Sequence, residues 1–94
     1  MNLYKEMFKE VQSKAFAAFR EGENETDKMT MEELASSLKI STRSYSDLEH
    51  HKFAASGWVF MMFLVRIGEE KSTELLREFR KRVIELDESG ATAQ

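Results

Sequence analysis

The sequence predicts an all-α fold. The 94-residue chain contains no proline and only four glycines, so little interrupts long helices and few positions suit the tight turns of β-hairpins. Apolar residues recur at spacings of three and four, and no stretch shows the period of two that is typical of a half-buried strand. The length is that of one domain. We therefore expect five helices in a single domain over residues 1–88, followed by a flexible tail over residues 89–94.

The first expected helix runs from about Leu3 to Arg20. Gly22 is expected to end it, and the polar, acidic residues 22–28 then form a loop. Its core-facing stripe is expected to consist of the apolar residues that recur every three or four positions, namely Tyr4, Met7, Phe8, Val11, Ala15, Ala18 and Phe19.

Two short helices follow, and each is marked by a capping residue. Thr30 with Glu33 three residues later forms a capping box, which predicts a helix from there to about Leu38. Ser41 is a second N-cap candidate and opens a helix that extends to about His50. Short helices separated by such a tight connection predict a helix-turn-helix unit over residues 30–50.

The last two expected helices differ in their patterns. Residues 57–67 are apolar on nearly every side, which predicts a buried central helix that ends at Gly68. A final helix is expected from about Ser72 to Asp87, with an apolar stripe formed by Leu76, Phe79, Val83 and Leu86. This stripe either joins two copies of the chain or packs on the protein's own core, and the sequence leaves both alternatives open.

Composition limits the compartment and the cofactors. The chain has no cysteine, so disulfides and thiolate metal sites are absent. Charged residues interrupt the amino terminus where a signal peptide needs apolar ones. The longest apolar run covers the eight residues 58–65, whereas a membrane span needs roughly 20. We therefore expect a soluble cytoplasmic protein with no membrane partner.

Residues 30–49 resemble the Cro/C1-type (Xre family) helix-turn-helix pattern. The family shows Thr or Ser, then Glu-Leu-Ala, a leucine, an apolar-Ser turn, an apolar residue and Leu-Glu. These positions are filled by Thr30, Glu33, Leu34, Ala35, Leu38, Ile40, Ser41, Tyr45, Leu48 and Glu49. The resemblance implies a five-helix, lambda-repressor-like domain with extended N- and C-terminal helices. It also implies a sequence-specific transcriptional regulator, a repressor in many members, that binds double-stranded DNA as a homodimer.

The same resemblance implies which residues contact DNA. The helix over residues 41–50 lies in the major groove, and Thr42, Arg43 and Asp47 match the positions that face the bases. Helical spacing agrees with this assignment. If Tyr45 and Leu48 lie on the inner side of the helix, positions 42, 43, 46 and 47 lie on its outer side. Arg43 is suited to guanine and Asp47 to the amino group of cytosine. The candidates for phosphate contacts are Ser41, Ser44, Ser46, His50 and Lys52.

An ion pair between Arg20 and Glu49 is a further implication of the resemblance. The family commonly pairs this glutamate with an arginine late in the first helix, and Arg20 occupies that place if the following loop carries a few extra residues. We expect a partly buried, bidentate pair. Removal of one partner would cost roughly 3–5 kcal/mol, because the other charge would stay buried.

Departures from the family pattern keep a second function open. Met31 stands where glutamine is common, and Lys39 stands where glycine is usual, so Lys39 is expected in a left-handed conformation. Four carboxylates, those of Glu21, Glu23, Glu25 and Asp27, crowd the loop that would lie near the DNA, and the net charge is −3. The alternative is an antitoxin or adaptor that has this fold, binds a co-encoded protein, and has weak or no affinity for DNA.

An enzyme is not expected. The sequence has no Gly-rich phosphate loop and no nucleophile elbow. His50 and His51 are adjacent, but no further ligand lies at a regular spacing, so we predict neither a metal site nor a cofactor.

Overall fold

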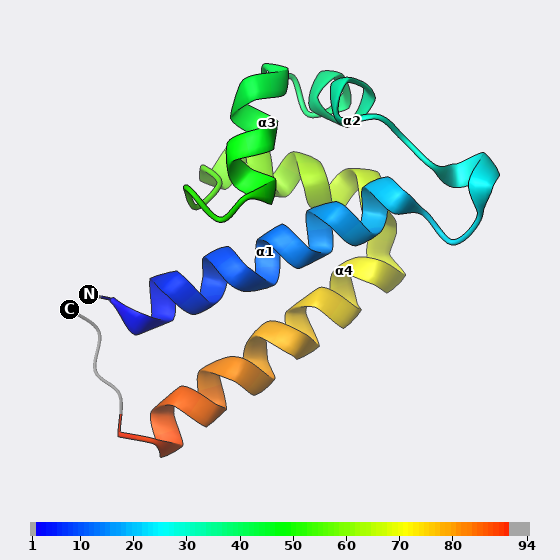
Figure 1. Ribbon diagram of the computed structural model, residues 1–94. Coiled ribbons are helices and arrows are strands. Elements are labelled where there is room, and N and C mark those ends of the chain that lie inside the picture. Colours follow the sequence, from blue (N-terminus) through cyan, green and yellow to red (C-terminus); the bar gives the residue numbers. More distant parts are fainter. Residues whose placement is uncertain (1, 91–94) are drawn as a thin grey trace.

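The computed structural model describes residues 2–90, and the protein is all-helical over that range (Figure 1). In chain order the elements are α1 (Leu3–Glu21), the 3-10 turn η1 (Glu25–Asp27), α2 (Met31–Ser37), α3 (Thr42–Glu49) and α4 (Gly57–Glu88). No strand occurs among residues 2–90, which confirms the all-α class. The expected tail includes residues 91–94, which lie outside the described residues.

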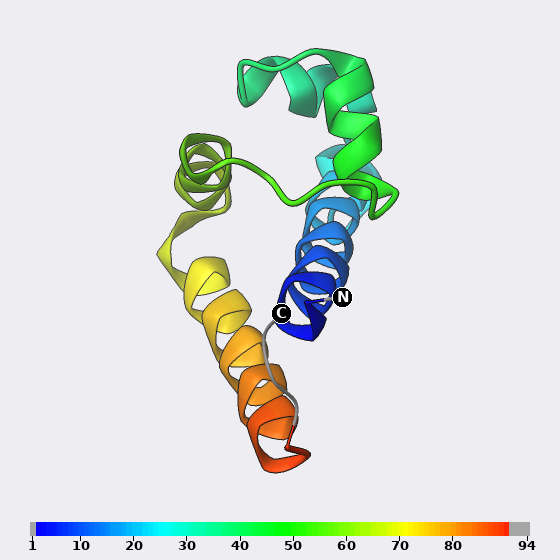
Figure 2. The same ribbon diagram turned by 90° about the vertical axis from the view of Figure 1, so that its left-hand side faces the viewer.

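The covered side of α1 is wider than the expected stripe, of which Met7 and Val11 are buried and Ala15 and Phe19 pack against the core. The helix begins where the side chain of Asn2 accepts a hydrogen bond from the backbone N–H of Lys5 (3.1 Å). Phe16, which the expected stripe omitted, is fully buried, whereas Ala18 is exposed. The reason is that α3 and α4 lie against different sides of α1 (Figure 2), so that burial extends beyond one narrow stripe.

The starts of α2 and α3 are capped as the sequence predicts. The Thr30 hydroxyl accepts a hydrogen bond from the N–H of Glu33 (3.1 Å), and the Glu33 carboxylate accepts one from the N–H of Thr30 (2.9 Å). The Ser41 hydroxyl accepts a hydrogen bond from the N–H of Ser44 (3.0 Å). In the turn between the helices Lys39 has a φ of 63°, which is the left-handed conformation expected at that position.

α4 changes direction sharply at Gly68. This residue has φ 85° and ψ 172°, a conformation that essentially only glycine adopts, and Figures 1 and 2 show the resulting bend. The helix resumes at once, so the expected gap before Ser72 is absent. We refer below to the N-terminal part of α4 (57–67) and the C-terminal part of α4 (69–88).

The core lies where α1, α2, α3 and the N-terminal part of α4 meet. Its buried residues are Phe16, Leu34, Ala35, Leu38, Tyr45, Leu48, Val59 and Phe63. Phe16 contacts both Phe63 (ring centroids 4.3 Å apart) and Tyr45 (5.6 Å, edge to face). Phe16 therefore joins the N-terminal part of α4 to α3 through α1.

The expectation that residues 57–67 are buried on every side is wrong. Only Val59 and Phe63 are buried there, while Trp58, Met61 and Val65 are 55%, 60% and 68% exposed. The rest of the core covers one side of this segment only. An apolar face therefore remains on the surface, which the composition of the helix alone did not reveal.

A membrane-spanning segment is missing from the described chain. None of the helices over residues 2–90 combines the length and the hydropathy that a bilayer crossing requires.

Candidate nucleic-acid interface

α3 is held firmly on its inner side. It packs against both α1 and α2, and its buried residues are Tyr45 and Leu48. Ile40, in the turn before α3, is partly buried and packs against the same cluster. Because two neighbouring helices fix α3, its outer side is presented in one orientation.

The first turn of α3 forms the exposed side. Ser41, Thr42, Arg43 and Ser44 are all exposed. Within residues 2–90 Arg43 takes part in no ion pair, so its guanidinium is available to a ligand. Ser41 and Ser44 are partly engaged with each other, because the Ser41 hydroxyl donates to the Ser44 hydroxyl (2.9 Å) in addition to its capping role. Thr42 and Arg43 are thus the most accessible of the predicted residues.

Positions 46 and 47 are less exposed than the helical spacing predicted. Both are half-buried, and the Asp47 side chain is only 24% exposed. The cause is the reversal of the chain after α3: His51 has a φ of 65°, and the N–H of Lys52 then donates to the carbonyl oxygen of Asp47 (2.9 Å). The Lys52 ammonium lies 3.5 Å from the Asp47 carboxylate, which neutralises it locally.

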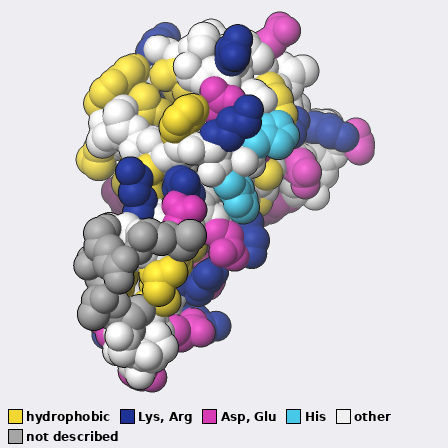
Figure 3. All heavy atoms as spheres, turned by 60° about the vertical axis from the view of Figure 1, so that its left-hand side comes forward, with side chains coloured by type: hydrophobic (Ala, Val, Ile, Leu, Met, Phe, Trp, Pro, Cys, Tyr) yellow, Lys and Arg dark blue, Asp and Glu magenta, His cyan; other side chains and the backbone are white. Residues whose placement is uncertain are grey.

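The end of α3 carries the remaining phosphate candidates. His50 and Lys52 are exposed, and Nδ1 of His50 lies 2.7 Å from the carbonyl oxygen and 3.2 Å from the hydroxyl of Ser46. Figure 3 shows the two histidines on one face together with basic, acidic and hydrophobic side chains. The charge on this face is mixed, so any attraction for an anionic ligand is local to particular basic side chains.

Arg20 and Glu49 form a bidentate ion pair that joins α1 to the end of α3. Nε and Nη2 of Arg20 donate to the two carboxylate oxygens of Glu49 at 3.0 and 2.8 Å. The side chains are 20% and 10% exposed, so the pair is largely shielded from water. The hydrogen bonds from Arg20 lower the pKa of Glu49, and those to Glu49 raise the pKa of Arg20. Both groups therefore stay charged and hold α3 in register with α1.

The buried hydroxyl of Tyr45 lies beside this ion pair. No hydrogen-bond partner for it is found among the described residues. Burial raises the pKa of Tyr45, and the nearby Glu49 carboxylate raises it further. Tyr45 is therefore a neutral core residue and not a group that titrates in the physiological range.

Gln12 is a positioning residue that the sequence analysis did not identify. It is fully buried on α1, and its amide nitrogen donates to the carbonyl oxygen of Phe53 (2.6 Å) while its amide oxygen accepts from the N–H of Ala55 (3.0 Å). These bonds fix the connection between α3 and α4. The available signal was its spacing: Gln12 lies four residues from both Phe8 and Phe16, so a polar residue interrupts an apolar row.

Most of the predicted dimerisation stripe faces inward. Phe79, Val83 and Leu86 are half-buried, and the Phe79 ring meets the Phe8 ring of α1 edge to face with centroids 5.6 Å apart. Leu76 is the exception, with 66% of its surface exposed. Of the two alternatives left open by the sequence, packing on the protein's own α1 accounts for Phe79.

The acidic residues before α2 remain on the surface. Glu21, Glu23, Glu25 and Asp27 are all exposed, and the last two lie in η1. Over residues 2–90 no three His, Asp or Glu side chains come together in a way that would hold a metal ion.

No family model matches the chain, and no curated protein or solved structure matches it either.

Proposed function

We propose that the protein is a sequence-specific DNA-binding transcriptional regulator of the Cro/C1 helix-turn-helix type, which inserts the first turn of α3 into the major groove. The observation that carries the proposal is the contrast between the two sides of α3. Its inner side is anchored by Tyr45, Leu48 and the Arg20–Glu49 pair, while its outer side presents Arg43 without an ion-pair partner over residues 2–90. Such a rigid helix with a free guanidinium at its start suits the reading of base edges.

Within this proposal Arg43 reads a guanine and the serines near it bind phosphate. Arg43 has the reach and the forked donors for a bidentate bond to guanine, and Ser41, Ser44 and Thr42 lie beside it at the start of the helix. Asp47 has a smaller role than the sequence implied, because its carboxylate is half-buried and faces Lys52. The proposal includes a homodimer that reads two half-sites and a location in the cytoplasm.

The test is DNA binding by the purified full chain. Bound fragments are selected from genomic DNA, and the affinity for the best fragment is measured as a function of salt concentration. The affinity should fall steeply as salt rises, because phosphate contacts release counterions. Arg43→Ala should weaken the specific site by about 1–3 kcal/mol and leave the affinity for random DNA nearly unchanged.

Arg80→Ala is the matched control, since Arg80 is also an exposed arginine but lies in the C-terminal part of α4. Arg80→Ala should leave the discrimination between the specific DNA site and random DNA unchanged. Circular dichroism checks that both variants keep the helical content of the parent. Equal discrimination by Arg43→Ala and the parent protein would contradict the assigned role.

A protein-binding function is the second candidate, and the exposed carboxylates of residues 21–27 favour it. They give the segment before α2 a negative potential that opposes binding to phosphate and suits a basic protein partner. In that case the chain is an antitoxin or adaptor with the same fold. The two candidates are separated by one result: an adaptor shows no DNA affinity even at low salt.

A further inference from the structure

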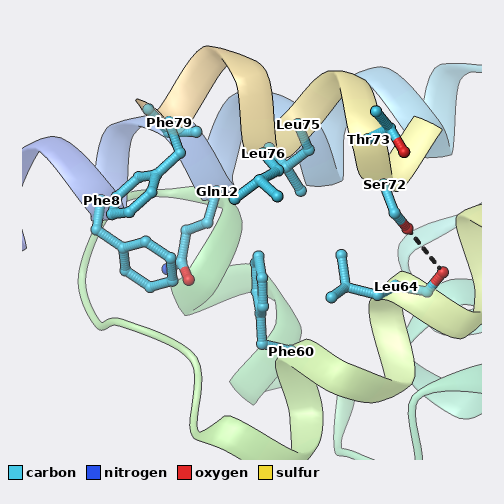
Figure 4. Close-up of a pocket in the computed structure, with 10 residues that line it drawn as sticks. Phe8, Gln12, Phe60, Leu64, Ser72, Thr73, Leu75, Leu76 and Phe79 are labelled. Carbon is cyan, nitrogen blue, oxygen red and sulfur yellow. Dashed lines mark hydrogen bonds between the residues drawn. The ribbon is translucent and has the colours of Figure 1, made fainter. Parts of the chain in front are cut away.

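A concave apolar groove lies between α1 and both parts of α4 (Figure 4). Its volume is about 400 Å³, which falls within the range of roughly 300–1,000 Å³ that is typical of small-molecule sites. It lies away from α3, because none of the residues that line it belongs to that helix. The groove is therefore separate from the proposed DNA-binding surface.

Three helical segments supply the walls. Val11 of α1 is a buried lining residue, and Phe60 and Leu64 come from the N-terminal part of α4. Leu76 stands at the exposed edge on the C-terminal part of α4. At one end the ring of Phe8 contacts that of Phe60, with centroids 5.4 Å apart. Since the two parts of α4 meet at the bend, a molecule in the groove touches both sides of that bend.

The polar groups in the wall already have partners within the protein. Both ends of the Gln12 amide are bonded to the backbone of Phe53 and Ala55. The Ser72 hydroxyl donates to a backbone carbonyl oxygen in the N-terminal part of α4 (3.1 Å), as the dashed line in Figure 4 shows. The Thr73 hydroxyl donates to the carbonyl four residues before it (2.9 Å). The wall therefore offers few free donors or acceptors, and no charged side chain lines it.

We propose that this groove binds a small, uncharged and predominantly apolar molecule. Burial of apolar surface drives the binding, because the wall has neither a charge nor a free polar group with which to hold an ionic ligand. The site goes beyond the proposed function and does not depend on DNA binding. Its occupant would join α1 to both parts of α4 and stabilise the bend.

A second copy of the chain is the competing occupant. A stable protein interface buries about 800 Å² on each partner, which exceeds what a pocket-sized hollow provides. The ion pair between Glu10 and Arg82 also joins α1 to the C-terminal part of α4, and its members follow the groove residues Phe8 and Phe79 by two and three positions, which places charged side chains beside that end of the groove. A small ligand fits this shape and polarity better.

The experiment uses phenylnaphthylamine, an uncharged dye that fluoresces in apolar surroundings, and the full chain. Binding is titrated in the parent protein and in two variants that place the same carboxylate on the surface. Leu76→Glu changes the edge of the groove, and Met61→Glu is the control, because Met61 is similarly exposed but does not line the groove. Methyl chemical shifts of Leu64 and Leu76 locate the dye, with exposed Val65 as a reference outside the groove.

We expect saturable binding of one dye per chain, with shifts at Leu64 and Leu76 but not at Val65. Leu76→Glu should weaken binding about tenfold or more, and Met61→Glu should leave it unchanged. The sulfonated analogue of the dye should bind more weakly than the uncharged one. Leu76→Trp adds a bulky ring at the edge of the groove and no charge. It should also weaken dye binding, which would show that the effect of Leu76→Glu is not due to its charge alone.

Three results would overturn the proposal. The first is dye binding that does not saturate, or a loss of dye affinity in Met61→Glu that equals the loss in Leu76→Glu. The second is tighter binding of the sulfonated analogue. The third is a dimer in light scattering that excludes the dye and becomes monomeric with Leu76→Glu, since the groove would then belong to the interface between two copies.

Discussion

α1 supports two regions that are packed very differently. On one side α2, α3 and the turn between them carry Leu34, Tyr45 and Leu38, none of which is exposed, and the shielded Arg20–Glu49 pair adds to this side. On the other side the C-terminal part of α4 has no buried residue at all over 69–88. It is held by half-buried apolar side chains and by polar contacts at the surface, such as the hydrogen bond from the Tyr4 hydroxyl to Asp87 (2.6 Å).

The difference shows that α1 fixes its two neighbours to different degrees. Dense packing fixes the orientation of α3, as a helix that must match the geometry of a ligand requires. Because residues 69–88 include no buried side chain, we expect the C-terminal part of α4 to open locally more easily than α3 does. Substitutions matched between the two regions test this contrast.

The largest expected effect is the removal of a core ring. Phe16→Ala should reduce the free energy of unfolding by about 4 kcal/mol, because its fully buried ring joins α3 to the N-terminal part of α4. Phe79→Ala, in the loosely packed region, should reduce it by roughly 1–2 kcal/mol, because that ring is half-buried and lies beside an open groove. Urea unfolding followed by circular dichroism measures the free energy of unfolding of both variants. Equal losses in the two would show that the two regions do not differ in packing.

Next in size is the loss of the shielded ion pair. Glu49→Ala should destabilise the protein by about 3 kcal/mol, because the Arg20 guanidinium would stay largely buried without its partner. Glu10→Ala removes the partner of Arg82 in the more exposed pair, and its effect should be below about 1 kcal/mol. The same unfolding experiment at neutral pH compares the two variants. Similar losses would show that the shielding of the Arg20–Glu49 pair has no energetic consequence.

The bend in α4 provides a third test. Gly68→Ala should cost about 1–3 kcal/mol, because alanine is strained at φ 85° and ψ 172°. A Cβ there would meet nothing within 4 Å, so backbone strain is the only source of the effect. Gly57→Ala is the control, since its Cβ also meets open space and its backbone lacks the positive φ. Thermal unfolding measures the stability of both variants. An equal loss in the two would contradict the strained backbone at residue 68.

The smallest expected effect is the acid dependence of the Arg20–Glu49 pair. Arg20 lowers the pKa of Glu49 in the folded protein below its ordinary value of 4.5. The pair therefore contributes its full stability above that value and loses it as the pH falls through the lowered pKa. Glu49→Gln does not titrate, so the stability difference between the parent and this variant should shrink below pH 4.5. A difference that stays constant as the solution is acidified would contradict the lowered pKa.

The sequence by itself determined the features that depend on near neighbours. The caps at Thr30 and Ser41 follow from hydrogen bonds within a few residues, and both are present. The left-handed turn at Lys39 is also present, but it was expected from the glycine of the family pattern and not from a preference of lysine. The all-α class follows from the spacing of apolar residues and the lack of proline. The contact between Arg20 and Glu49, which lie 29 residues apart, came from the family resemblance and not from local patterns.

The tertiary structure decided how far burial extends around each helix beyond the stripe that the spacing predicts. The burial of Phe16 and Gln12 and the exposure of Met61 depend on which segments lie alongside, and those segments are distant in the chain. An apolar side chain contributes to the core only where another element meets it. For the same reason the groove beside the bend, which three helical segments form together, has no signature in any one of them.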